Sequence, residues 1–440
     1  MNIEQARSRR RSPVEADPPG TATRRAALRL LDAVLRRGDP LDLASHAACQ
    51  GLAPNDRAFA IAIASETLRW LVDIDALIDS ATSDVLGDDV KARTVLRLGL
   101  AQLLVLDSPP HAVVSTALPL VAGGPRRLVH AILSRAQKDG WKLPAQASLP
   151  DPVKQRWTAQ WGADMAAAAA TAWSVAPPVD LSFADADSAT AFDEGQSLAP
   201  GHRRLPRSGR IDTVPDFASG DWWVQDLAAS IPARLLGLGD GRTILDLCAA
   251  PGGKTMQLAA AGWHVTAIDS SAKRLIRLTE NLARTGLAAE TLQADIRTWE
   301  PPTAADAILL DAPCSATGIF RRHPDVLHRI EPRNIADLAA LQQQLLARAA
   351  EWVKPGGALV FATCSLEPAE GEDQIAVFLA THAGWTIHPV RSDELPSGIL
   401  PHPDGWVRTL PDMLVDQGGL DGFFVARLRA PSAWAGQTVK

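Results

Sequence analysis

The sequence Thr243-Ile-Leu-Asp-Leu-Cys-Ala-Ala-Pro-Gly-Gly-Lys-Thr255 joins a short apolar run to a glycine turn. Residues 243–247 have the length and composition of a buried parallel strand. The strand is interrupted at residues 251–253, and a helix is expected over residues 254–261. A strand, a tight glycine turn and a helix open many nucleotide-binding α/β folds, because glycine lets the backbone approach a ligand closely. The sequence therefore predicts a nucleotide-like ligand beside this turn.

The spacing excludes two other nucleotide-binding motifs. A phosphate-binding P-loop requires Gly-x-x-x-x-Gly-Lys-Ser/Thr, and Cys248 stands where its first glycine is needed. The Gly-x-Gly-x-x-Gly pattern of dinucleotide-binding proteins is also absent from the glycine turn. The spacing therefore disfavours ATP hydrolysis and hydride transfer.

Acidic residues at the ends of the following apolar runs favour S-adenosylmethionine as the ligand. Asp269 ends a run at residues 264–268, and a carboxylate at the tip of a second strand can accept both ribose hydroxyls of an adenosine. Asp295 and Asp311 stand at comparable places further along the chain. A single aspartate of this kind is usually a helix cap or part of a solvated turn. Several aspartates in register with one glycine turn instead favour a cofactor crevice at the carboxyl edge of a sheet.

Composition and charge limit the class of protein. A chain of 440 residues is expected to form two or three domains. Its net charge of −6 gives no general attraction to nucleic acid, so RNA contacts must come from local basic patches. Four widely spaced cysteines, without a Cys-x-x-Cys pair, predict neither a metal site nor secreted disulfides and fit a reducing, cytoplasmic location. No apolar run reaches membrane-spanning length, so no membrane partner is expected.

The order of patterns predicts the domains. We expect a disordered basic tail over 1–20, a helical domain over 21–142, a linker and small RNA-binding subdomain over 143–235, an α/β domain over 236–430 and a tail over 431–440. Within the helical domain, an apolar stripe begins at Ala26, and further helices are predicted over 57–78, 90–106, 111–120 and 127–138. Strands are predicted over 243–247, 264–268, 291–292, 307–310, 358–362 and 422–428, with a late helix over 374–382.

Two cysteines follow neighbouring predicted strands. Cys314 lies in Asp-Ala-Pro-Cys-Ser-Ala-Thr-Gly318, and Cys364 lies in Ala-Thr-Cys-Ser-Leu366. Both are expected at the carboxyl edge of the sheet, whereas Cys49 is expected to be a small buried hydrophobe. A thiol beside a methyl donor suits the methylation of carbon 5 of cytosine. That carbon is a poor nucleophile, and addition of a thiolate to carbon 6 makes it reactive. Asp311 would lie near ring nitrogen 3, and Lys254 or a helix N-terminus would stabilise the thiolate.

Motifs in the first third of the chain resemble the NusB-like antitermination domain. These motifs are Asp56-Arg57-Ala58, the sequence Leu-Arg-Leu-Gly-Leu-Ala-Gln-Leu-Leu over 96–104, and Pro-Pro-His-Ala-Val-Val over 109–114. In that family the helical bundle binds RNA or packs against a partner.

The α/β part resembles the RNA 5-methylcytosine methyltransferases of the Sun/Fmu (ribosomal RNA small-subunit methyltransferase B) family. The resemblance rests on Asp-Leu-Cys-Ala-Ala-Pro-Gly-Gly-Lys-Thr, Asp-Ala-Pro-Cys-Ser-x-Thr-Gly and Thr-Cys-Ser-Leu-x-Pro-x-Glu-x-Glu, with Arg-Arg-His-Pro-Asp325 and Asp-Gly-Phe-Phe424 in support. It implies a Rossmann-like S-adenosylmethionine-dependent methyltransferase domain preceded by an all-α NusB-like domain. The expected substrate is a cytosine in small-subunit (16S) ribosomal RNA, and the expected enzyme is a cytoplasmic monomer without metal.

The resemblance also implies a role for each site residue. Cys364 would be the nucleophile, and Cys314 would assist release of the methylated RNA. The methionine part of the cofactor would be lined by Cys248, Ala249, Ala250, Pro251, Gly252, Gly253 and Lys254. Asp269 would bind the ribose, Asp295 would lie near the adenine, and Asp311 would lie between cofactor and base.

Alternatives remain at this stage. DNA 5-methylcytosine enzymes carry the nucleophile in a Pro-Cys motif, which here would be Cys314. A non-catalytic RNA-binding antitermination factor with a vestigial cofactor fold is a second alternative. Relatives often have an Arg-Val-Asn strand where this chain has residues 179–183, and many have glycine where it has Ala316. Two basic clusters are candidates for phosphate contacts: Arg203, Arg204, Arg207 and Arg210, which equally fit a solvated loop, and Arg321, Arg322 and His323.

Overall fold

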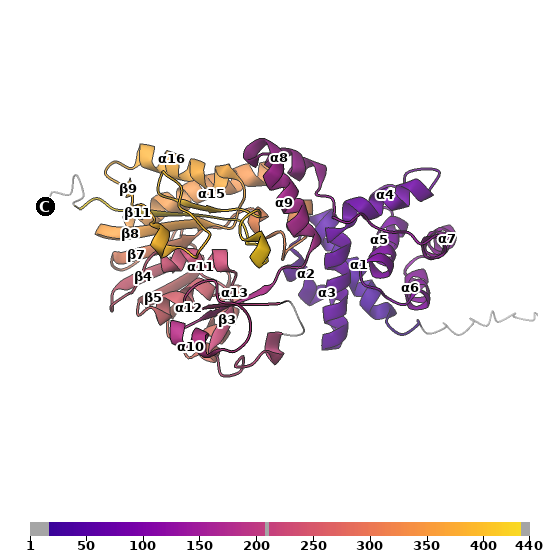
Figure 1. The fold of residues 1–440 in the computed structure, drawn as a ribbon, viewed down its shortest axis with the longest axis horizontal. Helices are drawn as coiled ribbons and strands as arrows, with labels where there is room; N and C mark the ends of the chain where they lie inside the picture. The colour runs from indigo at the N-terminus through magenta and orange to yellow at the C-terminus, as the bar shows by residue number, and fades with distance from the viewer. Residues whose placement is uncertain (1–16, 207–210, 433–440) are drawn as a thin grey trace, which may run out of the picture. The chain divides into compact units, whose positions relative to one another are not determined.

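The computed structural model describes residues 17–206 and 211–432 (Figure 1). The chain divides into two compact units, Met1–Ala145 and Gln146–Lys440. The predicted N-terminal tail, apart from residues 17–20, and Arg207 and Arg210 of the first basic cluster lie outside the described residues. The same holds for the C-terminal tail from residue 433 onward.

The first unit is all-helical, as the sequence predicts. Its helices are α1 (Thr21–Arg37), α2 (Leu41–Ala48), α3 (Pro54–Arg69), α4 (Leu71–Ala81), α5 (Lys91–Leu104), α6 (Pro110–Ala117), the 3-10 turn η1 (Leu118–Leu120) and α7 (Gly124–Lys138). Helix α5 is buried on all sides and forms the centre of the unit. Gly99 of α5 permits close packing of α7, because a Cβ atom there would lie 2.7 Å from Leu133 Cδ2.

Two details of the helical prediction are wrong. The helix expected over 57–78 is divided between α3 and α4, because Trp70 has a non-helical backbone conformation of φ −101° and ψ 16°. The apolar pattern continues on both sides of this one-residue break, so periodicity does not reveal it. The short helix α2 was not predicted from the sequence.

The second unit begins with a helical hairpin and a small sheet. Helices α8 (Asp151–Trp161) and α9 (Ala163–Ser174) form the hairpin. The antiparallel sheet has the order β2-β1-β3 and consists of β1 (Val179–Phe183), β2 (His202–Leu205) and β3 (Trp222–Val224), with α10 (Ala186–Ala191) between β1 and β2. The segment in which the family's Arg-Val-Asn pattern is missing therefore forms the central strand of this sheet.

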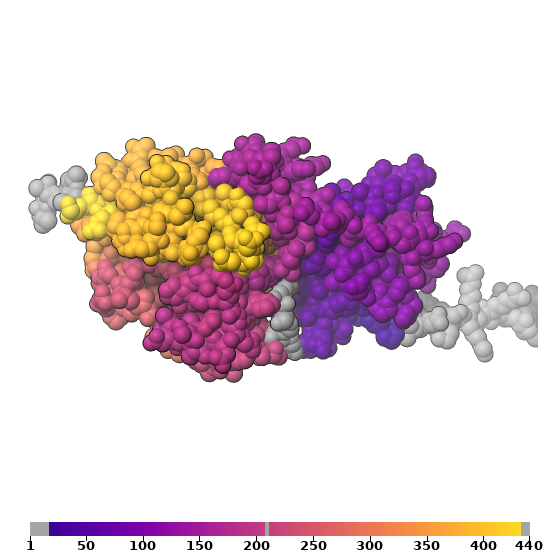
Figure 2. All heavy atoms as spheres, in the orientation of Figure 1, coloured from indigo at the N-terminus to yellow at the C-terminus, as the bar shows by residue number. Residues whose placement is uncertain are grey.

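Arg204 of β2 joins the small sheet to the C-terminal part of the unit. In Figure 2 the magenta-pink surface near the middle of the chain and the yellow surface near its C-terminal end adjoin. The Arg204 guanidinium donates to Asp180 at 2.6 and 2.7 Å and to the carbonyls of Gln417 and Gly419. Only 4% of Arg204 is exposed, so neither a phosphate contact nor a solvated loop is correct for it. Arg203 donates to two backbone carbonyls of the α10 region.

The main sheet has the strand order β10-β11-β8-β7-β4-β5-β6, and β9 pairs with β11. The five strands from β8 to β6 are parallel, and β11 is antiparallel to β8. The bounds are β4 (Thr243–Leu247), β5 (His264–Asp269), β6 (Glu290–Gln293), β7 (Ala305–Asp311), β8 (Val353–Thr363), β9 (Thr386–Ile387), β10 (Val407–Thr409) and β11 (Phe423–Arg429). Each predicted strand is present, most with differences of one or two residues at their ends. The strand predicted over 358–362 is longer than expected, because β8 begins at Val353 and includes residues 354–357.

Helices cover both faces of this sheet (Figure 1). They are α11 (Leu227–Arg234), α12 (Gly253–Ala260), α13 (Ala272–Thr285), α14 (Val326–Arg329), α15 (Pro332–Glu351) and α16 (Glu372–Thr381). Side chains alternate along β7: Ile308 and Leu310 pack in the cluster with α15 and α16, while Ala307 and Leu309 pack in the cluster with α11 and α12. This is the expected Rossmann-like arrangement of a buried parallel sheet.

The Asp180–Arg204 pair gives a test of the fold. Burial opposes ionisation of Asp180, but hydrogen bonds from Arg204 and His202 lower its pKa overall, so the carboxylate is charged. Arg204→Met leaves this buried charge without its main partner and is expected to lower the free energy of unfolding by about 3–5 kcal/mol in urea titrations. The double variant Asp180→Asn/Arg204→Met should recover much of this loss, because it removes the charge. Equal losses in the two variants would contradict this account.

Candidate active site

The strand register gathers the predicted site residues at one edge of the main sheet. Leu247 at the end of β4 lies opposite Ile268 of β5 and Leu310 of β7. The next residue of each strand or turn, Cys248, Asp269 or Asp311, therefore stands at the same level. Asp311 lies opposite Ala362 of β8, two residues before Cys364. Predicted cofactor residues and both cysteines thus share the carboxyl edge.

The glycine turn is tightly constrained. Cys248 has a left-handed backbone conformation with φ 61°, and Gly252 has φ 104°. A Cβ atom on Gly252 would lie 2.9 Å from Leu278 Cγ of α13, so both conformation and packing require glycine. Helix α12 begins at Gly253, which directs the N-terminal backbone N–H groups of the helix toward this edge. Burial, followed by Asp311 and Asp269, raises the pKa of Cys248 to about 12, so its thiol is not a candidate nucleophile.

Asp246 lies beneath this turn, within β4. It accepts a hydrogen bond of 2.6 Å from Thr255 Oγ1, and its Oδ1 has no hydrogen-bond partner among the described residues. Burial, opposed by the Thr255 hydrogen bond and reinforced by Asp311, raises the pKa of Asp246 to about 7. The turn therefore rests on a carboxyl group that is close to its titration point at neutral pH.

Asp269 closes the far side of the turn. Its carboxylate accepts from the backbone N–H of Ala250 at 3.2 Å and of Ser271 at 2.9 Å, and it pairs with Arg274 at 3.2 Å. Arg274 also donates to the carbonyl of Ala250, while half of its side chain remains exposed. Asp269 thus stabilises the turn itself, a contact that the sequence does not reveal.

Asp295 lies just beyond β6 and is more open than Asp269. Its carboxylate pairs with Arg297 at 2.6 Å and accepts from the Arg297 backbone N–H at 3.0 Å. The hydrogen bonds from Arg297 lower the pKa of Asp295, which keeps it charged. Its side chain is 39% exposed, so it is accessible to a ligand at the end of β6.

Lys254 and Asp311 link the glycine turn to the end of β7. The two side chains form an ion pair of 2.8 Å, and the ammonium lies 5.3 Å from the centre of the Phe423 ring. Burial alone would lower the pKa of Lys254, but Asp311 raises it above its ordinary value. The site therefore keeps a positive charge beside the cysteine loops.

The two loop cysteines are in contact. Cys314 Sγ and Cys364 Sγ lie 3.4 Å apart, and the backbone N–H of Gly318 donates to the carbonyl of Cys364 at 3.0 Å. The hydrogen bond with Cys364, together with burial, raises the pKa of Cys314 well above its ordinary value. Cys314 is therefore protonated at neutral pH and can donate its S–H to Cys364.

The residues that hold these loops were not predicted from the sequence. Glu370 accepts from Ser315 and Ser365, the residues that directly follow the two cysteines. Glu367 binds Arg156 of α8 at 2.8 Å. Glu370 is the first glutamate of the motif Thr-Cys-Ser-Leu-x-Pro-x-Glu-x-Glu, which was a signal for it, whereas Glu367 stands at an unspecified position of that motif.

The expected phosphate contacts of Arg321 and Arg322 are wrong. Arg321 is 2% exposed and donates to the carbonyl of Gly418 at 3.0 Å. Arg322 pairs with Asp226 and with Asp421, and it donates to the carbonyl of Pro178. These side chains connect the Cys314 loop to the region of the small sheet and to the C-terminal segment. Their positive charge is neutralised inside the protein.

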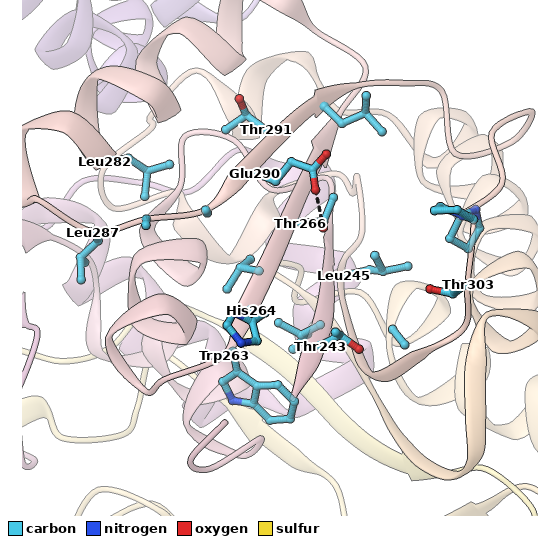
Figure 3. A pocket seen from close by; sticks show the side chains of 18 of the residues that line it. Thr243, Leu245, Trp263, His264, Thr266, Leu282, Leu287, Glu290, Thr291 and Thr303 are labelled. Carbon is cyan, nitrogen blue, oxygen red and sulfur yellow. Dashed lines mark hydrogen bonds between the residues drawn. The ribbon is translucent and has the colours of Figure 1, made fainter. Parts of the chain in front are cut away.

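A cavity of about 790 Å³ lies elsewhere on the sheet (Figure 3). It is lined by residues of β4, β5 and β6, including Thr243 and His264 at the starts of their strands. Thr266 donates to Glu290 at 3.3 Å in its wall. None of the predicted cofactor residues or cysteines lines it, so it is separate from the crevice at the carboxyl edge.

The fold and site define a Rossmann-like methyltransferase with two cysteines beside its cofactor turn. The family described as 16S rRNA methyltransferase RsmB/F matches residues 233–429, and the NusB family matches residues 21–138. Ribosomal RNA small subunit methyltransferase B of Erwinia tasmaniensis is 34% identical over 93% of this chain and 98% of its own length. The Xanthomonas campestris protein of the same name is 35% identical over 86% of this chain and 92% of its own length.

The solved structure "Crystal Structure of PH0851" has a TM-score of 0.71 and 22% identity, covering 94% of this chain and 99% of its own, which supports the fold. The chain belongs to the RsmB/F family of 16S rRNA methyltransferases and carries the family's N-terminal NusB region. It is accordingly an S-adenosylmethionine-dependent rRNA (cytosine-C5)-methyltransferase, as the motifs predicted. Among residues 17–206 and 211–432, no helix is long and apolar enough to cross a membrane.

The raised pKa of Asp246 predicts a specific pH dependence of stability. In the folded protein this carboxyl keeps its proton up to about pH 7, whereas in the unfolded chain it ionises near pH 4, so its contribution to stability is lost as pH rises between these values. Asp246→Asn cannot ionise and should gain stability relative to the unsubstituted protein from pH 5 to pH 8, by up to about 4 kcal/mol.

Urea unfolding of the cofactor-free protein at several pH values measures this difference. Asp373→Asn, at an exposed position of α16, is the control and should show a flat difference. A flat difference for Asp246→Asn as well would show that Asp246 ionises normally.

Proposed function

We propose that this enzyme methylates carbon 5 of a cytosine in 16S ribosomal RNA through a covalent adduct with Cys364. The contact between Cys314 and Cys364, at 3.4 Å and next to the Lys254–Asp311 ion pair, carries this proposal. The raised pKa of Cys314 disfavours its thiolate, which supports Cys364 over Cys314 as the nucleophile.

The residues around the glycine turn fit S-adenosylmethionine. Gly252 leaves room for close approach of a ligand, and the buried Asp246 retains an oxygen with no described partner. We assign residues 248–254 to the methionine part, Asp269 to the ribose and Asp295 to the adenine. When bound, the cofactor supplies an electrophilic methyl group.

The chain's own residues prepare and release the base. Addition of the Cys364 thiolate to carbon 6 forms an S–C bond and moves the ring's π electrons toward carbon 5, which becomes nucleophilic. We assign Asp311 to ring nitrogen 3, where a proton shared with this carboxyl group would neutralise the negative charge that develops. After methylation, a base takes the carbon 5 proton, the C–H electrons restore the ring double bond, and Cys364 Sγ leaves carbon 6 as a thiolate; we assign Cys314 to assist this release.

RNA recognition is assigned to two regions. The NusB region over residues 21–142 and the segment over residues 143–235 would bind RNA outside the reacting base. A target cytosine in a duplex must be extruded, or presented in a loop, to reach the thiols. We further propose that the enzyme works as a monomer in the cytoplasm.

Separate replacement of the two cysteines tests the nucleophile. Cys364→Ala should abolish methylation, because no adduct can form. Cys314→Ala should instead trap enzyme on RNA as a covalent complex that survives denaturing gels. Labelled S-adenosylmethionine with 16S RNA, followed by bisulfite sequencing, provides the readout. If the two outcomes were interchanged, Cys314 would be the nucleophile. If the unsubstituted protein bound RNA but transferred no methyl group, it would be a non-catalytic antitermination factor.

Replacement of the strand-end acids tests the cofactor assignment. Asp269→Asn should raise the Kd for S-adenosylmethionine at least 10-fold in calorimetry, because a charged hydrogen bond to the ribose and the support of the turn are both weakened (about 1.5–3 kcal/mol). Asp306→Asn, on the opposite edge of the same sheet, serves as the control. An unchanged Kd for Asp269→Asn would remove Asp269 from the binding site.

A further inference from the structure

We propose that Glu370 is a positioning residue that holds Cys314 and Cys364 at reacting distance; this inference rests on the proposed two-cysteine chemistry. Glu370 lies in the 3-10 turn η4 (Pro368–Glu370), between the Cys364 loop and α16. It touches neither sulfur atom in the described contacts. It acts through the residue that follows each cysteine.

One carboxylate connects the two loops. Glu370 Oε1 accepts from the backbone N–H of Ser315 at 2.9 Å, and Oε2 accepts from the Ser315 hydroxyl and from the Ser365 hydroxyl at 2.5 Å. Ser315 Oγ and Ser365 Oγ lie 3.2 Å apart. Because each serine adjoins a cysteine, the position of Glu370 determines the relative position of the two sulfur atoms.

The backbone and a helix hold Glu370 in turn. Its carbonyl accepts from the Thr363 hydroxyl at 2.8 Å, on the other side of Cys364. Gln342 of α15 donates to Glu370 Oε1 at 3.1 Å and to the carbonyl of Pro313, directly before Cys314, at 2.9 Å. The network therefore brackets both cysteines and anchors them to α15.

Burial of the ionisable side chain of Glu370 without a paired cation is energetically costly, which indicates that the residue is kept for the bonds it makes. The residue is fully buried, and no cation among the described residues pairs with its carboxylate, unlike the neighbouring Glu367 and Glu372, which pair with Arg156 and Arg408. Burial raises the pKa of Glu370, while hydrogen bonds from Ser315, Ser365 and Gln342 oppose the rise. A carboxylate can accept all these bonds at once, which a neutral side chain of the same size cannot do.

Two variants distinguish a positioning role of Glu370 from a role in folding. Glu370→Ala removes the link, and Glu370→Gln keeps the side-chain length and one acceptor oxygen. We expect kcat to fall about 100-fold in Glu370→Ala and about 10-fold in Glu370→Gln, with KM for RNA and Kd for S-adenosylmethionine within about twofold of the unsubstituted values. Partial rescue by glutamine, with kcat and not KM affected, is the pattern of a positioning residue.

A second measurement reports the sulfur spacing without catalysis. Treatment with a diazene dicarboxamide oxidant joins two neighbouring thiols: each loses its hydrogen, an S–S bond forms, and the oxidant is reduced to the hydrazine. Peptide mass mapping then follows the Cys314–Cys364 disulfide, with Cys49 and Cys248 as internal references. The disulfide should form readily in the unsubstituted protein and about 10-fold more slowly in Glu370→Ala. Asp373→Asn, at an exposed position of α16 three residues after Glu370, should form it at the original rate.

The possible outcomes distinguish a failure of the Glu370 role from a failure of the proposed cysteine mechanism. Normal kcat and a normal disulfide rate in Glu370→Ala overturn the role of Glu370 while leaving the cysteine mechanism intact. A loss of cofactor binding or of thermal stability in both variants indicates a purely structural role and also overturns it. Full activity of Cys364→Ala would instead overturn the proposed function.

Discussion

The parallel pairing of β4, β7 and β8 is the constraint on which the site depends. The register places Leu310 beside Leu247 and Ala362 beside Asp311, so the turns that leave these strands start at one level. A shift of one residue would turn the side chains of a strand to the opposite face. The two faces pack against different helices, so such a shift would disrupt the packing on both faces and is strongly disfavoured. Core packing thereby determines the position of residues that take no part in the core.

Packing also reaches the cysteine loops from the helical hairpin. Trp157 of α8 donates its indole N–H to Glu367 at 3.2 Å and packs against Phe320, which follows the Cys314 loop. Trp161 donates to the carbonyl of Leu366 at 2.9 Å. One helix thus contacts the segments that follow both cysteines. These tryptophans therefore support both cysteine loops from outside the sheet.

The sequence predicted what is local or periodic. The order of strands and helices and the glycine turn follow from apolar spacing and from the need for glycine at residue 252. The motifs that surround Cys314 and Cys364 placed both residues at the correct edge. Ala316 has a left-handed backbone conformation with φ 58°, which glycine adopts with less strain and which the alanine in the sequence does not reveal.

The sequence failed where a charge is paired with a residue far along the chain. Arg204 and Arg322 look like phosphate contacts in a basic cluster, but their partners Asp180, Asp226 and Asp421 are separated from them by 24, 96 and 99 positions. No local pattern reveals such pairing. The same limit applies to the RNA surface, because counts of arginine include side chains whose charge is neutralised inside the protein.

The pairing of two thiols in one site has a consequence for the order of chemical events. The hydrogen bond with Cys364 is the largest cause of the raised pKa of Cys314, followed by burial, and the nearby Glu370 adds to the rise. In the proposed mechanism, bonding of Cys364 Sγ to the base would convert that sulfur into a neutral thioether and weaken the main cause of the raised pKa. Cys314 would then lose its proton more easily than in the free enzyme. The proposed adduct would therefore favour ionisation of the second cysteine at the stage where release is required.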